Sequence, residues 1–257
     1  MSKFNDRTGE ISTNNQGCKM QIVSYRSNKD VDILFIDNNI TIYNQPYSVF
    51  NSGEIKNPMF PSVYNRGYMG IGKYECRING IMTPQYKRWE SMMHRCYDER
   101  YLAKQPTYID CEVGEYFLNY QNFAKWYDEN LWTNDVLLVP DKDILIKGNK
   151  IYEPDKCFLV DKTINNLFLK RVINKGSLPT GVHYDKERNK FIATCHGADK
   201  KTKFLGRFDN PIDAFVVYKK YKESVIKEVA NIYKTKYENF PKKLYETMIN
   251  YKIEIDD

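Results

Sequence analysis

The sequence Gly181-Val182-His183-Tyr184-Asp185, followed by Asn189–Cys195 (NKFIATC) and Phe204–Asp209 (FLGRFD), decides the fold of the C-terminal part of this chain. Each run is short and rich in β-branched and aromatic residues, and polar residues and glycine separate the runs, which is typical of strands joined by turns. An amphipathic stretch then begins at Pro211, with Asn210 in the position of a helix N-cap. We therefore predict three antiparallel strands and one helix in residues 179–239.

The alternation of side chains along these strands predicts two different faces. One face would pack on the helix and form a small core from Phe191, Ala193, Leu205, Phe208, Ala214 and Tyr218. The opposite face, which we call the open face, would carry His183, Arg188, Thr194, His196, Thr202 and Phe204.

The order of residues in this region (GV, KF-x-A, LG-x-F, then Ala214 and Tyr218) resembles AP2/ERF-type DNA-binding domains, which also occur in phage endonucleases and integrases. The resemblance implies that the open face docks in the major groove of double-stranded DNA. Arg188 and Lys190 are the expected main contacts, because long cations reach both bases and phosphates. The full set of DNA-binding residues implied in this way is His183, Arg188, Lys190, Thr194, His196, Thr202 and Phe204. The same pattern also permits a solvated sheet face that contacts no DNA.

The charge of the chain is concentrated in the same region. The whole chain has a net charge of +6, and residues 179–239 hold 13 Lys or Arg against 8 Asp or Glu, a difference of +5. A basic excess on one segment favours contact with phosphate groups. The 21 tyrosines support a second interpretation, because tyrosine gives a large contact area at low entropic cost in protein interfaces.

The middle of the chain, residues 81–174, contains a separate group of motifs. They are Trp89-x-x-Met92-x-x-Arg95-Cys96-Tyr97, Pro106-Thr107-Tyr108, Asn122-Phe123-x-x-Trp126-Tyr127, Asp141-Lys142-Asp143-Ile144-Leu145 and Gly148-Asn149-Lys150. This set resembles phage proteins described as HNH-endonuclease-like, many of which carry AP2 domains. Such a nuclease holds one divalent metal in a ββα hairpin and uses a histidine as general base. No histidine lies between His94 and His183, so the motif is degenerate.

The resemblance implies candidate catalytic residues around the acidic pair Asp141 and Asp143. Both would bind Mg²⁺, which prefers hard oxygen ligands, and Asn165 would be a later metal ligand. Asn149 would orient the hairpin, and Lys142 would serve as a base only if burial strongly depressed its pKa. The alternative is that these residues are turn and cap groups kept from a nuclease ancestor. The missing histidine favours this alternative over a working Mg²⁺-dependent endonuclease.

The remaining sequence predicts an α+β protein with a β-rich N-terminal module. We expect a hairpin from 31–36 and 40–43, a helix over 47–52 that ends at Gly53, and irregular β structure over 61–74. Helices are predicted after Thr83-Pro84 and over 118–129, with a last short helix at 244–251. The predicted domains are 1–80, 81–174, 179–239 and 240–257, with a linker at 172–179.

Several classes of protein are not indicated by the sequence. The six cysteines form no Cys-x-x-Cys pair, and no histidine has zinc-finger spacing to them, so we expect reduced thiols that are buried or half-buried. The N-terminus is polar and no apolar run reaches about 18 residues, so we expect a cytoplasmic protein with no membrane partner.

The leading interpretation is a phage-type DNA-binding protein, derived from an HNH endonuclease, that has weak or no nuclease activity and works inside an infected bacterial cell. One alternative is a protein-interaction module that inhibits a host enzyme or defence complex, and the other is an active Mg²⁺-dependent endonuclease.

Overall fold

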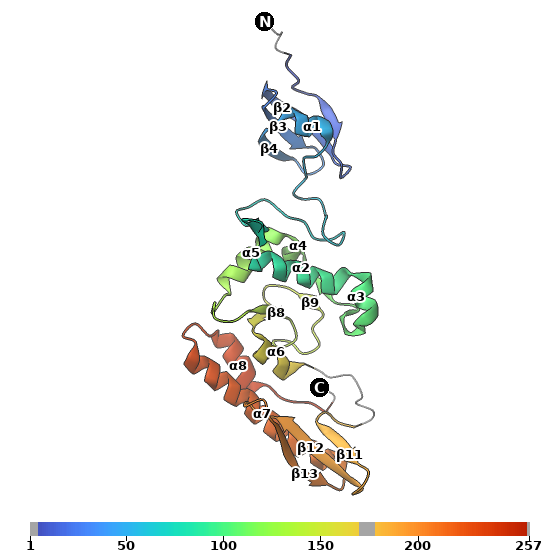
Figure 1. Cartoon of the computed structure of the whole chain (residues 1–257), viewed down its shortest axis with the longest axis vertical. Helices are drawn as coiled ribbons and strands as arrows, with labels where there is room; N and C mark the ends of the chain where they lie inside the picture. The colour runs from blue at the N-terminus through green and yellow to red at the C-terminus, as the bar shows by residue number, and fades with distance from the viewer. Residues whose placement is uncertain (1–4, 170–177, 256–257) are drawn as a thin grey trace. The chain divides into compact units, whose positions relative to one another are not determined.

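The computed structural model describes residues 5–169 and 178–255, and it is a mixed α+β structure (Figure 1). The chain forms two compact units. The first unit is Met1–Thr107 with Glu115–Lys125, and the second is Tyr108–Gly114 with Trp126–Asp257. The domain limits predicted after residue 80 and around 174–179 do not coincide with this division. Most of the predicted linker, residues 172–177, lies outside the described residues.

The N-terminal part of the first unit is a four-stranded antiparallel sheet in which consecutive strands are neighbours. Its strands are β1 (Ile11–Thr13), β2 (Lys19–Ser27), β3 (Asp30–Phe35) and β4 (Ile40–Gln45), and helix α1 (Tyr47–Ser52) follows. The predicted hairpin and helix are confirmed, and the helix ends at Gly53 in the left-handed conformation, with φ 70°. Strands β1 and β2 extend the sheet beyond the hairpin that the sequence predicts.

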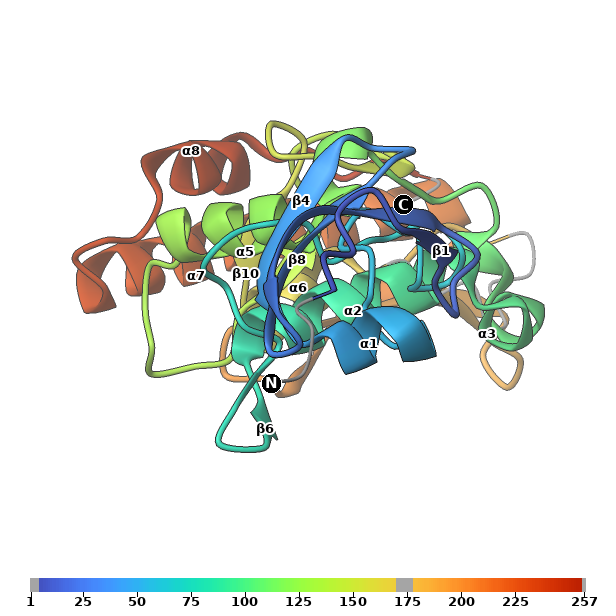
Figure 2. The same ribbon diagram turned by 90° about the horizontal axis from the view of Figure 1, so that it is seen from above.

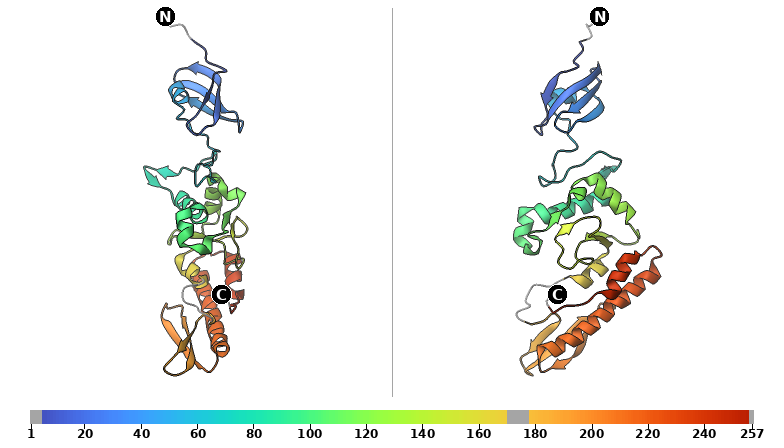
Figure 3. Two further views of the ribbon diagram at one scale, coloured as in Figure 1. Left: turned by 90° about the vertical axis from the view of Figure 1, so that its right-hand side faces the viewer. Right: turned by 180° about the vertical axis from the view of Figure 1, so that it is seen from behind.

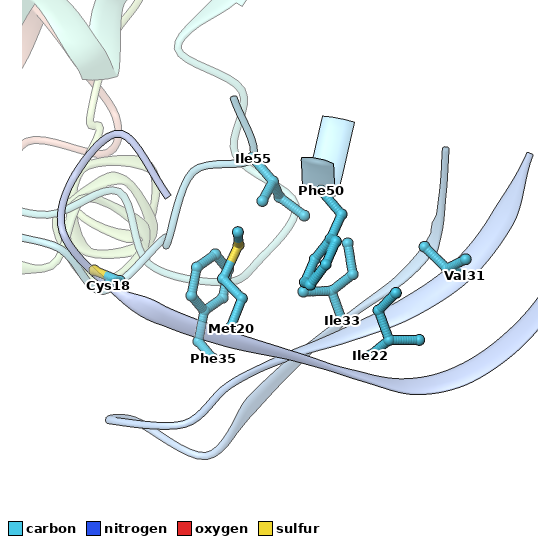
Figure 4. Close-up of a cluster of buried hydrophobic side chains, with 8 residues drawn as sticks. All are labelled: Cys18, Met20, Ile22, Val31, Ile33, Phe35, Phe50 and Ile55. Carbon is cyan, nitrogen blue, oxygen red and sulfur yellow. The ribbon is translucent and has the colours of Figure 1, made fainter. Parts of the chain in front are cut away.

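One face of this sheet and α1 enclose a single apolar core, drawn in Figure 4. Alternate residues of β2 and β3 point into it, as the two-residue period of a strand requires. The buried members are Cys18, Met20, Ile22, Val31, Ile33, Phe35, Phe50 and Ile55.

The rest of the first unit is a short hairpin and a group of helices. The elements are β5 (Arg77–Ile78), β6 (Ile81–Met82), α2 (Pro84–Tyr97), α3 (Glu99–Lys104), α4 (Glu115–Leu118) and α5 (Tyr120–Glu129), whose last turn belongs to the second unit. The helix predicted after Thr83-Pro84 is confirmed as α2. The Thr83 side chain caps the N-terminus of this helix by accepting the Tyr86 N–H. The helix predicted over 118–129 is divided at Asn119 into α4 and α5.

The second unit contains two small two-stranded ladders and a helix before its C-terminal sheet. Strand β7 (Glu112–Val113) pairs in parallel with β9 (Ile151–Tyr152), and β8 (Val139–Asp141) pairs antiparallel with β10 (Phe158–Val160). Helix α6 (Lys162–Phe168) begins at Asp161, whose side chain accepts the Ile164 N–H.

The C-terminal sheet has the three antiparallel strands that the sequence predicts. They are β11 (Val182–Asp185), β12 (Lys190–His196) and β13 (Thr202–Phe208), in that order, followed by α7 (Pro211–Lys236) and α8 (Lys242–Asn250). Asn210 caps α7 by accepting the Asp213 N–H. Figures 1 and 3 show α7 along one face of the sheet, and Ala193, Ala214 and Tyr218 are buried there. Phe191, Leu205 and Phe208 are half-buried, so the predicted core is formed with a partly open edge.

Gly181 directly precedes β11, at a point where the backbone packs closely against α7. Its φ of +77° lies in the left-handed region, and an added Cβ would overlap the ring of Tyr218. Gly148 has nearly the same φ, +72°, but open space where its Cβ would lie. Gly148→Ala therefore measures the backbone strain alone, whereas Gly181→Ala adds the clash with Tyr218.

We expect Gly181→Ala to lower the free energy of unfolding by about 2 kcal/mol more than Gly148→Ala, because overpacking typically costs 1–3 kcal/mol. Urea denaturation of the two variants beside the wild type gives the comparison. Equal losses in the two variants would mean that Gly181 does not pack against Tyr218.

Candidate nucleic-acid interface

The open face of β11–β13 lies opposite α7, and none of the helices and strands described in the second unit covers it (Figures 1 and 3). The strand register places His183, Ile192 and Arg207 side by side in one row across the three strands. Two shorter rows follow toward the far end of β12, with Thr194 beside Phe204 and His196 beside Thr202. The structure therefore brings together on one face the residues that the sequence predicts there.

A β-bulge at Leu205 decides which residues of β13 face outward. Ala193 pairs with Gly206 and Thr194 pairs with Phe204, so Leu205 has no partner of its own on β12. An extra residue reverses the alternation of side chains beyond it. Phe204 and Arg207 therefore share the open face although they are three residues apart.

Arg207 is the open-face residue that the sequence analysis misses. Its guanidinium carbon lies 5.0 Å from the centre of the Phe204 ring, and its Nε lies 3.5 Å from a carboxylate oxygen of Asp185. Phe204 is 57% exposed, so the arginine and the aromatic ring form one accessible surface. One feature of the sequence indicated this position of Arg207. Leu205 and Phe208 are three residues apart, so both can face the helix only if the strand contains a bulge between them.

Each predicted DNA-contacting cation has a carboxylate partner within the domain. Arg188 lies 3.4 Å from Asp185 and 3.5 Å from Glu187, and Lys190 pairs with Asp209. Surface ion pairs of this kind contribute little to stability, typically 0–1 kcal/mol. A phosphate group can therefore replace a carboxylate as the partner at little cost.

Asp185 is the central anion of the open face. Burial acts to raise its pKa, but hydrogen bonds from the Arg188 backbone and side chain, with one from Arg207, outweigh burial and lower the pKa. The carboxylate is therefore ionised at neutral pH and holds both arginines beside it.

The polar residues of the face are accessible as well. His183 and His196 are exposed, and the Nδ1 atom of His196 lies 3.2 Å from the Thr202 hydroxyl group, so the two form a hydrogen bond. Thr194 is half-buried. The face thus offers two imidazoles and two hydroxyl groups beside its cations.

The acidic pair in the middle of the chain is arranged differently from a metal site. One carboxylate oxygen of Asp141 accepts the backbone N–H groups of Asp143 and Ile144, each at 2.9 Å. The residue as a whole is half-buried, but its carboxyl group is enclosed, and burial raises the pKa of Asp141. Asp141 therefore closes the turn after β8, as expected for the turn-and-cap alternative.

Lys142 does not meet the condition for a general base. Its side chain is 7% exposed and its Nζ lies 2.8 Å from an Asp143 oxygen. Burial acts to lower the pKa of Lys142, but the hydrogen bond and negative charge of Asp143 outweigh burial, and the pKa is raised. The ammonium group is therefore charged at neutral pH, and it occupies one oxygen of the second predicted metal ligand.

Asn149 binds the backbone of the loop from both sides. Its amide group donates to the carbonyl oxygens of Lys142 and Ile151, and its oxygen accepts the Ile151 N–H. These three hydrogen bonds hold the turn between Lys142 and Ile151 in place. Asn165 lies half-buried on α6, outside this loop.

The described residues contain no group of three His, Cys, Asp or Glu side chains that would hold a metal ion. No disulfide joins the six cysteines; five of them are buried and Cys76 is half-buried. Burial raises the pKa of Cys157 to about 12 and also raises that of Cys111. Over the same residues, every helix is too short or too polar to cross a membrane.

Comparisons of the chain with protein-family models, with curated proteins and with solved structures give no significant match.

Proposed function

We propose that this protein binds duplex DNA through the open face of β11–β13 and has weak or no nuclease activity. The observation that carries the proposal is the row of His183, Ile192 and Arg207 on an uncovered sheet face, with Arg188 beside it. A sheet of three strands fits against a DNA groove, and cations along its edge would contact phosphates on either side.

The chemistry of the face also indicates how sequence would be read. Arg207 and Arg188 are suited to phosphates or to the acceptor edge of guanine, whereas the exposed ring of Phe204 is suited to the methyl group of thymine. The two arginines share Asp185, so the face has a modest net charge. We therefore expect moderate affinity with weak sequence preference.

We expect no strong nuclease activity because the two carboxylates of the acidic pair are engaged within the protein. Asp141 caps a turn and Asp143 pairs with Lys142, so both carboxylates have structural partners. We infer that the middle motifs are retained from an HNH endonuclease of phage type and that the one around Asp141 and Asn149 stabilises the second unit.

The test of DNA binding is a titration of the whole chain against a labelled duplex at increasing KCl concentrations. The logarithm of affinity should fall linearly with the logarithm of salt, with a slope of about −2 to −4 for three or four phosphate contacts. If the chain does not bind the duplex at a low salt concentration, about 50 mM KCl, the proposal is overturned.

The test of catalysis uses supercoiled plasmid with Mg²⁺ or Mn²⁺, and we expect no cleavage above background. Asp141→Asn is the informative variant, because asparagine keeps the oxygen that accepts the two N–H groups and removes the charge that a metal needs. Cleavage by the wild type that disappears in Asp141→Asn, with folding unchanged, would make this protein an enzyme.

A further inference from the structure

The hairpin β5–β6 in the first unit has no role in the function proposed above. Ile78 and Ile81 pair across its two strands and are 57% and 70% exposed. Figure 2 shows β6 and the turn before it projecting away from α2. We infer that this hairpin is an apolar wedge that enters a groove of duplex DNA and unstacks one base step.

The hairpin is built rigidly enough to act as a wedge. Its loop is the pair Asn79 and Gly80, with φ of 51° and 78°, the left-handed conformations that a tight two-residue turn needs. The Arg77 guanidinium donates to the Gly80 carbonyl oxygen at 3.0 Å, which ties the strand to the tip.

The base of the hairpin is anchored in the core of the first unit. The Thr83 backbone N–H donates to the Cys76 carbonyl oxygen, and its hydroxyl group donates to the Glu75 carbonyl oxygen. The fully buried Tyr120 donates its hydroxyl group to the same Glu75 oxygen at 2.9 Å. Because these hydrogen bonds anchor the base, the hairpin would keep its position when the two isoleucines enter between base pairs.

The hairpin and the segments on either side of it in the sequence carry a basic excess, which favours a polyanion as the partner. Residues 73–88 contain four cations, Lys73, Arg77, Lys87 and Arg88, against the single acid Glu75. Two isoleucines provide far less area than the roughly 800 Å² that each partner buries in a standard protein interface. Apolar side chains of this size, flanked by cations, are instead suited to separating base pairs while the cations contact the phosphates. The inference rests on the proposed function, because it requires that the chain binds duplex DNA.

The test uses the whole chain and a duplex with 2-aminopurine beside one central TA step, since pyrimidine–purine steps unstack easily. Binding of the wild type should increase the 2-aminopurine fluorescence several-fold. In Ile78→Thr with Ile81→Thr the increase should be lost and the affinity should fall about tenfold, equivalent to about 1.4 kcal/mol. Threonine keeps the strand preference of isoleucine and adds a polar group.

The matched control is Ile11→Thr with Val23→Thr, which changes two exposed strand residues of the same unit, 62% and 40% exposed. It should keep both the fluorescence increase and the affinity. Binding without a fluorescence increase, or an increase that survives in Ile78→Thr with Ile81→Thr, would overturn the wedge and leave the proposed function intact. No binding by the wild type would overturn both. A dimer of the wild type that is lost in the hairpin variant would assign the tip to a second copy of the chain and so overturn the wedge.

Discussion

Replacing Trp132 with alanine is expected to lower the free energy of unfolding of the second unit by about 3–5 kcal/mol, the usual loss for a large buried aromatic side chain. Trp132 is 5% exposed, and its ring centre lies 6.1 Å from that of Tyr233, 5.1 Å from that of Tyr237 and 5.2 Å from that of Phe240. Its Nε1 donates to the Leu159 carbonyl oxygen at 2.8 Å. One side chain thus connects β10 with the C-terminal end of α7.

Trp132→Phe separates the two contributions of this residue. Phenylalanine keeps most of the aromatic contact and loses the hydrogen bond to Leu159, so we expect a loss of about 1–2 kcal/mol. Urea denaturation followed by circular dichroism measures both variants. If Trp132→Ala stayed within about 1 kcal/mol of the wild type, the α7 end would not depend on this cluster.

The same cluster joins the C-terminal end of α7 to other parts of the second unit. Tyr233 donates its hydroxyl group to Asp161 at 2.6 Å, and Asp161 also caps α6. Trp132 is about one hundred positions away from its aromatic partners, and Asp161 is about seventy positions away from Tyr233. No local pattern in the sequence indicates contacts over such separations. Local signals located the helix and its N-terminal cap, and the domain limit predicted around 174–179 falls within the range of the second unit.

Local signals predicted the elements themselves well. Asn210-Pro211 and Thr83-Pro84 mark helix starts because the side-chain oxygen satisfies a free N–H group and proline fits the first turn. Gly53 marks a helix end because it adopts φ 70° without strain. These signals depend on neighbours a few residues away, so they are readable without the fold.

The candidate site was predictable only in part, for a physical reason. The outward position of Arg207 depends on the bulge at Leu205, and a bulge is set by pairing with another strand. The pairing of Arg188 and Arg207 with one carboxylate depends on the same register. For Asp141 the residue types alone permit either a metal ligand or a turn cap, and the two N–H groups that one of its oxygens accepts at 2.9 Å depend on how the chain turns after β8.

Reversing the charge of both open-face arginines, in Arg188→Glu with Arg207→Glu, is expected to reduce DNA affinity about a hundredfold at low salt. Two phosphate contacts are lost and two repulsive charges replace them, and the salt slope should fall by about 2. Lys227→Glu with Lys243→Glu is the matched control, because it makes the same change of net charge at exposed positions on α7 and α8. A titration by fluorescence anisotropy measures all three proteins.

Asp185→Asn gives the opposite sign and so tests the mechanism rather than the charge alone. Asp185 holds Arg188 and Arg207, and its pKa is lowered by their hydrogen bonds, so at neutral pH it is an anion on the open face. Asparagine keeps an acceptor for the Arg188 backbone and releases both guanidinium groups to phosphates. The affinity should then rise about threefold to tenfold, by removal of one repulsive charge near the backbone. Two results together would contradict a role of the open face: Asp185→Asn binds DNA with the affinity of the wild type, and the arginine and lysine double variants lose affinity equally. DNA binding would then depend on net charge alone.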